Sequence, residues 1–176
     1  GTAAAAAAAP SAAAAAPSAA ADTVTSVTAA GGISGGRGGA ILYDTRSGTF
    51  MAADPQRYLG ESLSSASSPP RVFFAGAEHT HVLQHALQLE MVKAVEAIDD
   101  APTLIGLEMC WRQHQPALDA FVFGDEARGG GSIDLLARRT QWSRTWGYPI
   151  ELYADVLSYA RERRLRLCGL NTPYPV

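Results

Sequence analysis

The chain has 176 residues, with 14 Lys and Arg against 17 Asp and Glu and a formal net charge of −3. Acidic and basic residues are interspersed, so a nucleic-acid partner is not expected. Two cysteines are too few for a disulfide framework or a Cys-rich zinc site. No run of about 18 apolar residues predicts a transmembrane helix.

The first 39 residues differ in composition from the rest of the chain. Residues 1–21 carry no charge and are mostly Ala, and residues 31–39 are mostly Gly. Because this composition gives no periodic apolar face, we expect a low-complexity tail over 1–39 and the folded domain over 40–176. The Ala, Ser, Thr and Pro content fits a plastid transit-peptide remnant, which would place the protein in a chloroplast or plastid. A plain low-complexity tail is the alternative.

Strand and helix signals alternate along the folded part. We expect an N-terminal β-hairpin, followed by an α/β fold with a three-layer, mainly parallel sheet and crossover helices. Because the chain stops five residues after the last predicted strand, we expect an incomplete domain. The predicted hairpin pairs 40–44 with 49–51, the core strands are 72–76, 103–109 and 165–171, and the helices are 55–65, 82–98, 116–123, 133–139 and 149–164.

Three of the four histidines, His79, His81 and His85, lie within seven residues just after the first predicted core strand. Ligands of open α/β sheets bind beyond the carboxyl ends of the strands. Imidazole is also a common ligand of transition metals and of haem iron. His81 and His85 have the spacing of a zinc-binding helix, but without its intervening glutamate. The fourth histidine, His114, is expected on a surface turn.

Polar residues also lie at the ends of the other two core strands. Glu108 and Asn171 would meet Glu78 and His79 at one edge of a parallel sheet. A carboxylate after an apolar strand must be solvated, paired or ligating, since burying it alone is costly. His79 and Glu108 are therefore candidate metal ligands. Asn171 is either a ligand-binding group or a cap of its strand.

Several short blocks follow one another in a fixed order along the folded part. They are Gly106-Leu107-Glu108-Met109 with Gln115-Pro116-Ala117-Leu118-Asp119-Ala120-Phe121, then Arg139-Thr140, Trp142, Trp146-Gly147-Tyr148 and Tyr153, and last Leu170-Asn171. Over residues 40–171 this order resembles the ChaN-like haem-binding domain of the Tiki superfamily, known from bacterial lipoproteins and plastid proteins. The resemblance implies a domain that binds haem or a related tetrapyrrole in iron or haem handling. The implied site residues are His79, His85, Glu108, Trp142, Tyr148 and Asn171.

The first motif departs from the family pattern Gly-Glu-x-His, because the family glutamate falls on Ala77. Neighbouring strand side chains face opposite ways, so Glu78 is not expected to replace it unless a bulge at Gly76 shifts the register. This loss favours a binding protein over an enzyme. The alternatives are a hydrolase that uses a divalent metal, and a non-catalytic scaffold that acts as a homodimer or within a larger complex.

Overall fold

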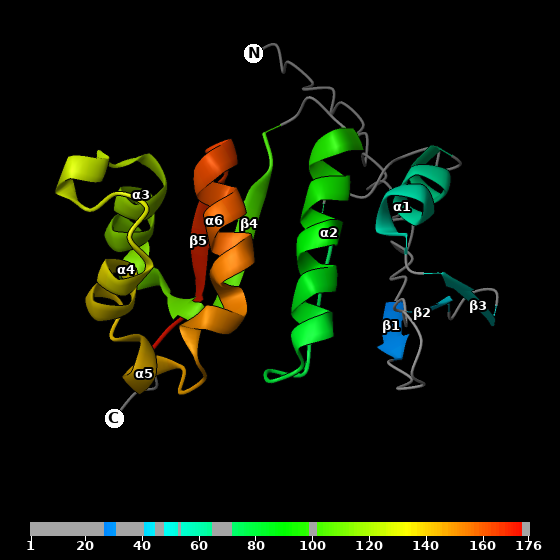
Figure 1. Ribbon diagram of the computed structural model, residues 1–176, viewed down its shortest axis with the longest axis horizontal. Helices are drawn as coiled ribbons and strands as arrows, with labels where there is room; N and C mark the ends of the chain where they lie inside the picture. The colour runs from blue at the N-terminus through cyan, green and yellow to red at the C-terminus, as the bar shows by residue number, and fades with distance from the viewer. Residues whose placement is uncertain are drawn as a thin grey trace, which may run out of the picture.

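The computed structural model describes residues 27–30, 41–44, 48–52, 54–64, 72–98 and 102–173 (Figure 1). These residues form a mixed α/β fold with a small parallel sheet. The strands are β1 (Val27–Ala30), β2 (Ile41–Asp44), β3 (Thr49–Ala52), β4 (Leu104–Trp111) and β5 (Arg166–Asn171). The α-helices are α1 (Pro55–Ser64), α2 (Val82–Ile98), α3 (Gln115–Phe123), α4 (Ile133–Arg139), α5 (Trp142–Thr145) and α6 (Ala154–Arg163), and the 3-10 helices are η1 (Arg112–His114), η2 (Glu126–Arg128) and η3 (Ile150–Tyr153).

The parallel pair β4–β5 organises the core. Leu104 lies opposite Arg166 at one end of the pair, and Trp111 lies opposite Asn171 at the other. One face packs against α3, α4 and α6, whereas Leu104 and Leu170 on the other face are 55% and 57% exposed. Apolar burial on that single face therefore holds the described domain together, and the three-layer arrangement stays a prediction. The buried cluster is Leu107, Cys110, Leu118, Phe121, Val122, Leu136, Trp142, Ile150, Tyr153, Leu157, Ala160, Leu165 and Leu167.

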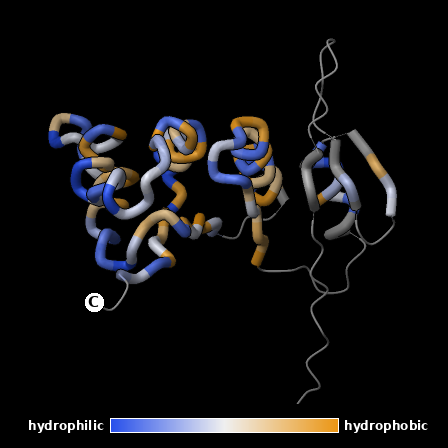
Figure 2. Tube along the Cα trace, turned by 90° about the horizontal axis from the view of Figure 1, so that it is seen from below, coloured by the Kyte–Doolittle hydropathy of each residue, from blue (hydrophilic) through white to orange (hydrophobic). Residues whose placement is uncertain are grey.

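The predicted first core strand, 72–76, is the main correction. The segment is extended but does not pair with any described strand, and Val72 and Phe74 are 66% and 84% exposed. It leads as a hydrophobic stretch into α2 (Figure 2). An apolar β-branched and aromatic run favours extended backbone, but ladder pairing depends on which partner lies alongside. Here side chains of α2 bind the backbone at the end of this segment instead.

Helix α2 begins and ends at the predicted residues, Val82 and Ile98, and only some of its apolar side chains are buried. Ala94 is buried, whereas Leu83 is 52% exposed and His85 is only 8% exposed. The helix lies beside α6 (Figure 1) and contacts it and η3 along the line of His85, Val92 and Glu96. The hydrophobic periodicity predicted which residues form the helix, but the segments that pack against it determine which of its side chains are buried.

The segment 115–171 follows the predicted elements closely. α3, α4 and β5 lie where the pattern places them, whereas the first turn of the helix predicted over 149–164 is the 3-10 helix η3 and α6 begins at Ala154. Ser132 caps α4 by accepting a hydrogen bond from the Leu135 N–H at 3.2 Å. Trp142–Thr145 form the short helix α5, where no helix was predicted.

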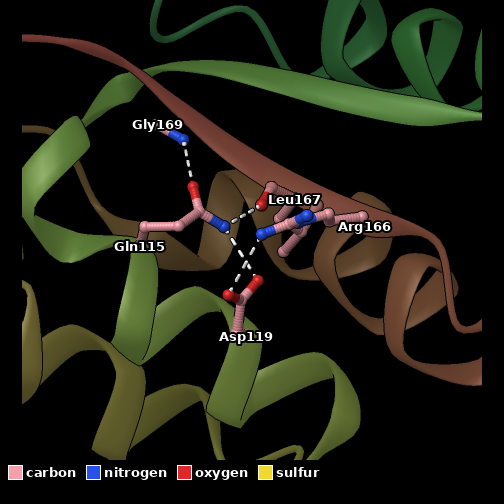
Figure 3. A network of polar contacts seen from close by, with 5 residues as sticks. All are labelled: Gln115, Asp119, Arg166, Leu167 and Gly169. Carbon is pink, nitrogen blue, oxygen red and sulfur yellow. Dashed lines mark hydrogen bonds and ion pairs between the residues drawn. The ribbon is translucent and has the colours of Figure 1, made fainter.

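Gln115 closes the outer edge of β5 (Figure 3). Its side-chain amide donates to the Leu167 carbonyl at 2.7 Å and accepts from the Gly169 N–H at 3.3 Å, as a neighbouring strand would. The amide also donates to Asp119 at 2.8 Å, and Asp119 accepts from Arg166 at 3.3 Å. The amide satisfies backbone groups that an edge strand otherwise leaves unpaired. The block that starts at Gln115 thus has a structural role.

The sheet β1–β2–β3 is separate and antiparallel. β2 pairs with β3 so that Leu42 lies opposite Met51, and β1 adds Val27–Ala30 at the other side. The expectation that residues 1–39 lack regular structure is wrong for these four residues. The other residues of the expected tail, including the Ala-rich and Gly-rich stretches, lie outside the described part.

Two expectations from composition concern cysteines and membranes. Cys110 and Cys168 are both free, and burial raises the pKa of the Cys110 thiol to about 12. That pKa keeps the thiol protonated at neutral pH. Among the described residues, no helix is long and apolar enough to cross a membrane.

Candidate functional site

The imidazole of His79 packs against two aromatic side chains, which also contact each other. Its ring centroid is 4.6 Å from that of Trp146 and 4.7 Å from that of Tyr148, and the two aromatic centroids are 5.7 Å apart. His79 is half-buried, and within the described residues its ring nitrogens make no hydrogen bond. We call His79, Trp146 and Tyr148 the His79 cluster. It combines a free imidazole with flat apolar surfaces.

His85 supports this cluster from beneath. Its Nε2 donates to the His79 carbonyl oxygen at 3.0 Å, and its Nδ1 lies 3.0 Å from Gln88 Oε1. The ring also meets Tyr153 edge-on, with centroids 4.6 Å apart. Both nitrogens of this buried imidazole are therefore engaged by the chain itself. His85 positions the backbone of His79, and it is not free to bind a ligand in this arrangement.

Two glutamines of α2 fix the backbone just before His79. Gln88 Nε2 donates to the Ala75 carbonyl at 2.5 Å, and the Glu78 N–H donates to Gln84 Oε1 at 2.6 Å. Together with His85 they hold the turn that carries His79 without a β-ladder. Such side-chain contacts restrict the orientation of a ligating group.

Tyr153 joins the cluster to the core. It is 4% exposed, its hydroxyl accepts from Trp146 Nε1 at 2.9 Å, and its ring centroid lies 5.4 Å from that of Trp142. Burial raises the pKa of Tyr153, the hydrogen bond from Trp146 opposes this, and the negative charge of Glu108 raises the pKa further. Glu108 therefore adds negative charge near the Tyr153 hydroxyl, which accepts the hydrogen bond from Trp146.

A bulge in β4 presents Glu108. Leu107 pairs with Gly169 and Trp111 with Asn171, so four residue steps on β4 match two on β5. A Cβ at Gly169 would lie 2.5 Å from the Trp111 carbonyl oxygen, which explains why glycine occupies this position. Bulges often turn a side chain at the edge of a binding site. Here the carboxylate of Glu108 is exposed at the bulge.

Comparison with protein-family models identifies the family. A family model described as haem-binding uptake, Tiki superfamily, ChaN, matches residues 63–176. The chain belongs to this ChaN family. The match spans every residue discussed in the site, and it confirms the resemblance expected from the order of the motifs. The family supports haem-related binding by this ChaN-like chain. Searches of curated proteins and of solved structures found no match.

Two predicted site residues of the ChaN-like chain lie apart from the His79 cluster or beneath it. Trp142 is 3% exposed, and its Nε1 donates to the Tyr148 carbonyl at 2.8 Å, so it holds the backbone of that tyrosine. Asn171 uses its side-chain oxygen to accept from the Thr172 N–H at 2.9 Å. The structure thus groups His79 and Tyr148, supports them with His85 and Trp142, and leaves Asn171 at the strand end.

The residues after Gly76 follow the alternation expected of extended backbone. Ala77 and His79 are half-buried, whereas Glu78 between them is exposed. Gly76 does not adopt the left-handed conformation that a glycine bulge would use. Among the described residues, no three His, Cys, Asp or Glu side chains are grouped as metal ligands.

The sequence did not indicate Tyr153 as a site residue, although it belongs to the motif blocks that carry the resemblance, and it misplaced one histidine. Trp146, expected with Trp142 and Tyr148 either to line a flat ligand or to be a packing anchor, packs against His79. His114 was expected on a surface turn but is only 8% exposed, and it stacks on Trp111 with ring centroids 5.4 Å apart. The position of His114 before α3 could not show that Trp111, at the end of β4, would stack on its ring.

Proposed function

We propose that this ChaN-like chain binds haem or a related tetrapyrrole at the His79 cluster, with the His79 imidazole facing the iron. The observation that carries the proposal is the unpaired imidazole of His79 packed against Trp146 and Tyr148. Histidine and tyrosine are both known axial ligands of haem iron, and aromatic rings stack on a flat macrocycle. The donor set therefore fits haem.

His79 and His85 have different roles in this proposal. His85 is buried with both nitrogens engaged, so it acts as a positioning residue for His79. Tyr148 is the second candidate iron ligand, because its half-buried hydroxyl makes no hydrogen bond among the described residues. Glu108 is exposed at the bulge of β4 and contributes negative charge near Tyr153.

The test is a titration of the purified chain with ferric haem, followed by the Soret band. We expect a saturable shift at about micromolar haem, which corresponds to roughly 8 kcal/mol of binding free energy. His79→Ala should abolish the shift or weaken it by more than tenfold, and Tyr148→Phe should move the band if the phenol is the ligand. His81→Ala is the matched control and should bind nearly as the unmodified chain does.

The outcomes separate the assignments. Equal loss in His79→Ala and His81→Ala would contradict the placement of the ligand. Stoichiometric zinc uptake without a Soret shift would favour the metal-dependent alternative over haem.

We further propose that this binding serves iron or haem handling in a plastid, in a homodimer or larger complex. The acid-poor composition of residues 1–39 supports the plastid assignment. A fluorescent reporter fused to residues 1–39 should enter plastids, and a diffuse cytosolic signal would remove the assignment. Size-exclusion chromatography with light scattering would show whether the chain assembles.

A further inference from the structure

Tyr153 is the buried residue at which the supports of the His79 cluster meet. It is the last residue of η3, directly before α6, and its side chain is 4% exposed. Its ring centroid lies 4.6 Å from that of His85, at an interplanar angle of 66°, and 5.4 Å from that of Trp142, at 60°. Its hydroxyl accepts the hydrogen bond from Trp146 Nε1 at 2.9 Å. The ring is therefore held by the core, while its oxygen reaches the cluster.

The indole of Trp146 stands on a turn and has one polar anchor. Trp146 follows α5, and the next residue, Gly147, has a left-handed φ of +84°. An indole carries a single N–H donor and no acceptor. Among the described residues, Tyr153 is the only partner of that donor. Because the ring is only half-buried, packing leaves it some freedom, and the hydroxyl of Tyr153 restricts how it rotates.

The orientation of the indole matters because Trp146 contacts both other members of the cluster. Its ring is tilted by 51° to that of His79, with centroids 4.6 Å apart, and by 61° to that of Tyr148, with centroids 5.7 Å apart. A rotated indole would change both contacts and the flat surface on which a macrocycle stacks. Burial raises the pKa of Tyr153 above its ordinary 10.0, so the anchor stays a neutral phenol at neutral pH.

We propose that Tyr153 is a positioning residue for ligand binding, because its hydroxyl fixes the plane of the Trp146 indole and thereby the stacking surface of the His79 cluster. Its side chain is buried in the core and does not itself contact the ligand. The effect on haem rests on the proposed function. The hold on the indole is a property of the ligand-free chain and is measured separately.

The first measurement uses the full ligand-free chain labelled with ¹⁵N and follows the indole Nε1–H resonances. Tyr153→Phe keeps the ring and its contacts with His85 and Trp142 but removes the acceptor. The Trp146 resonance, assigned with Trp146→Phe, should move upfield because its N–H loses a hydrogen bond. The Trp142 resonance should stay in place, because its acceptor is the Tyr148 carbonyl, and it reports that the core is intact. An unchanged Trp146 resonance would overturn the proposal.

The second measurement is haem affinity by Soret titration, with Tyr159→Phe as the matched control. Tyr153→Phe should weaken binding by about tenfold, the lower end of the usual effect for residues that orient a ligating group, and should shift the Soret band. Tyr159→Phe also removes a hydrogen-bonded hydroxyl, but that hydroxyl donates to Glu96 outside the cluster, so the affinity should change by less than about twofold. Equal losses in the two variants would refute positioning.

A double variant shows whether Tyr153 acts through Trp146. In a Trp146→Phe background the indole N–H is gone, so adding Tyr153→Phe should cost less than about twofold in haem affinity. A loss as large as in the unmodified background would show that Tyr153 acts through core packing, and would overturn the proposal. If the unmodified chain gives no saturable Soret shift, the proposed haem binding fails. The Trp146 resonance then decides by itself whether Tyr153 holds the indole.

Discussion

The buried imidazole of His85 donates a hydrogen bond from Nε2 to the main-chain carbonyl of His79, 3.0 Å away. One histidine thus positions another through the backbone, and only the outer imidazole is left free. We predict that His85→Leu lowers haem affinity by about 10- to 100-fold, the usual range for residues that orient a ligand. His85→Gln keeps a donor and should restore part of the affinity.

The Soret position separates positioning from a loss of folding in this prediction. His85→Leu should shift the Soret band because the His79 imidazole is misoriented, while far-ultraviolet circular dichroism keeps the helical signal. An unchanged band with unchanged affinity would show that the carbonyl of His79 needs no support.

The two residues after Gly76 give a second prediction. Glu78 is exposed and its side chain makes no hydrogen bond or ion pair among the described residues, so Glu78→Ala should leave haem affinity within about twofold. Ala77 is half-buried on the side of His79, so Ala77→Glu should change the affinity by introducing a charge there. Haem titration measures both variants. A damaging Glu78→Ala would indicate that the extended backbone does not persist in the bound state.

The two hydrogen bonds between the Gln115 side-chain amide and the backbone of β5 give a stability prediction. Gln115→Leu leaves the Leu167 carbonyl and the Gly169 N–H without their partner, so it should lower the free energy of unfolding by about 1–3 kcal/mol. Urea unfolding measures the loss. Gln113→Leu, two residues earlier and exposed, is the control and should change stability by less than roughly 0.5 kcal/mol.

Alanine substitutions at two glycines should change the stability of the protein in opposite directions. Gly169→Ala places a Cβ 2.5 Å from the Trp111 carbonyl oxygen, so it should destabilise the fold by about 1–3 kcal/mol. Gly60→Ala lies in α1 with no atom near the added Cβ, so it should stabilise the protein by roughly 0.5–1 kcal/mol. Thermal unfolding of both variants tests this, and a neutral Gly169→Ala would mean that the bulge can relax.

The contacts of Glu96 on α2 with Tyr159 and Arg163 on α6 should make the free energy of unfolding depend on pH. Hydrogen bonds from Arg163 and then Tyr159 lower the pKa of the Glu96 carboxyl from its ordinary 4.5. Because the folded pKa is the lower one, this stabilisation is present above about pH 4.5 and is lost as pH falls through the folded pKa. The stability difference between the unmodified chain and Glu96→Gln should therefore shrink in acid.

Urea midpoints at a series of pH values measure that difference. Glu90→Gln on the same helix is the control, since Glu90 forms only a partly exposed pair with Lys93 at 2.7 Å. A gap between Glu96→Gln and the unmodified chain that stays constant from neutral pH to pH 3 would contradict the assignment.

Sequence alone determined most of the local elements from α2 onward, α5 excepted, and the family. The bounds of α2, α4 and β5, and the cap at Ser132, follow from patterns that act within a few residues. The order of the motif blocks also identified the haem-binding family. Such signals survive because capping, periodicity and strand propensity are properties of neighbouring residues.

Only the tertiary structure decided which of these residues meet. Nothing in the sequence shows that His85 turns inward to support His79, or that the aromatic partners of His79 come from a turn more than sixty residues later. The apolar run at 72–76 predicted a core strand, yet α2 side chains bind the backbone that follows it. Ladder partners, buried faces and ring contacts depend on how distant segments pack, and local propensity carries no information about that packing.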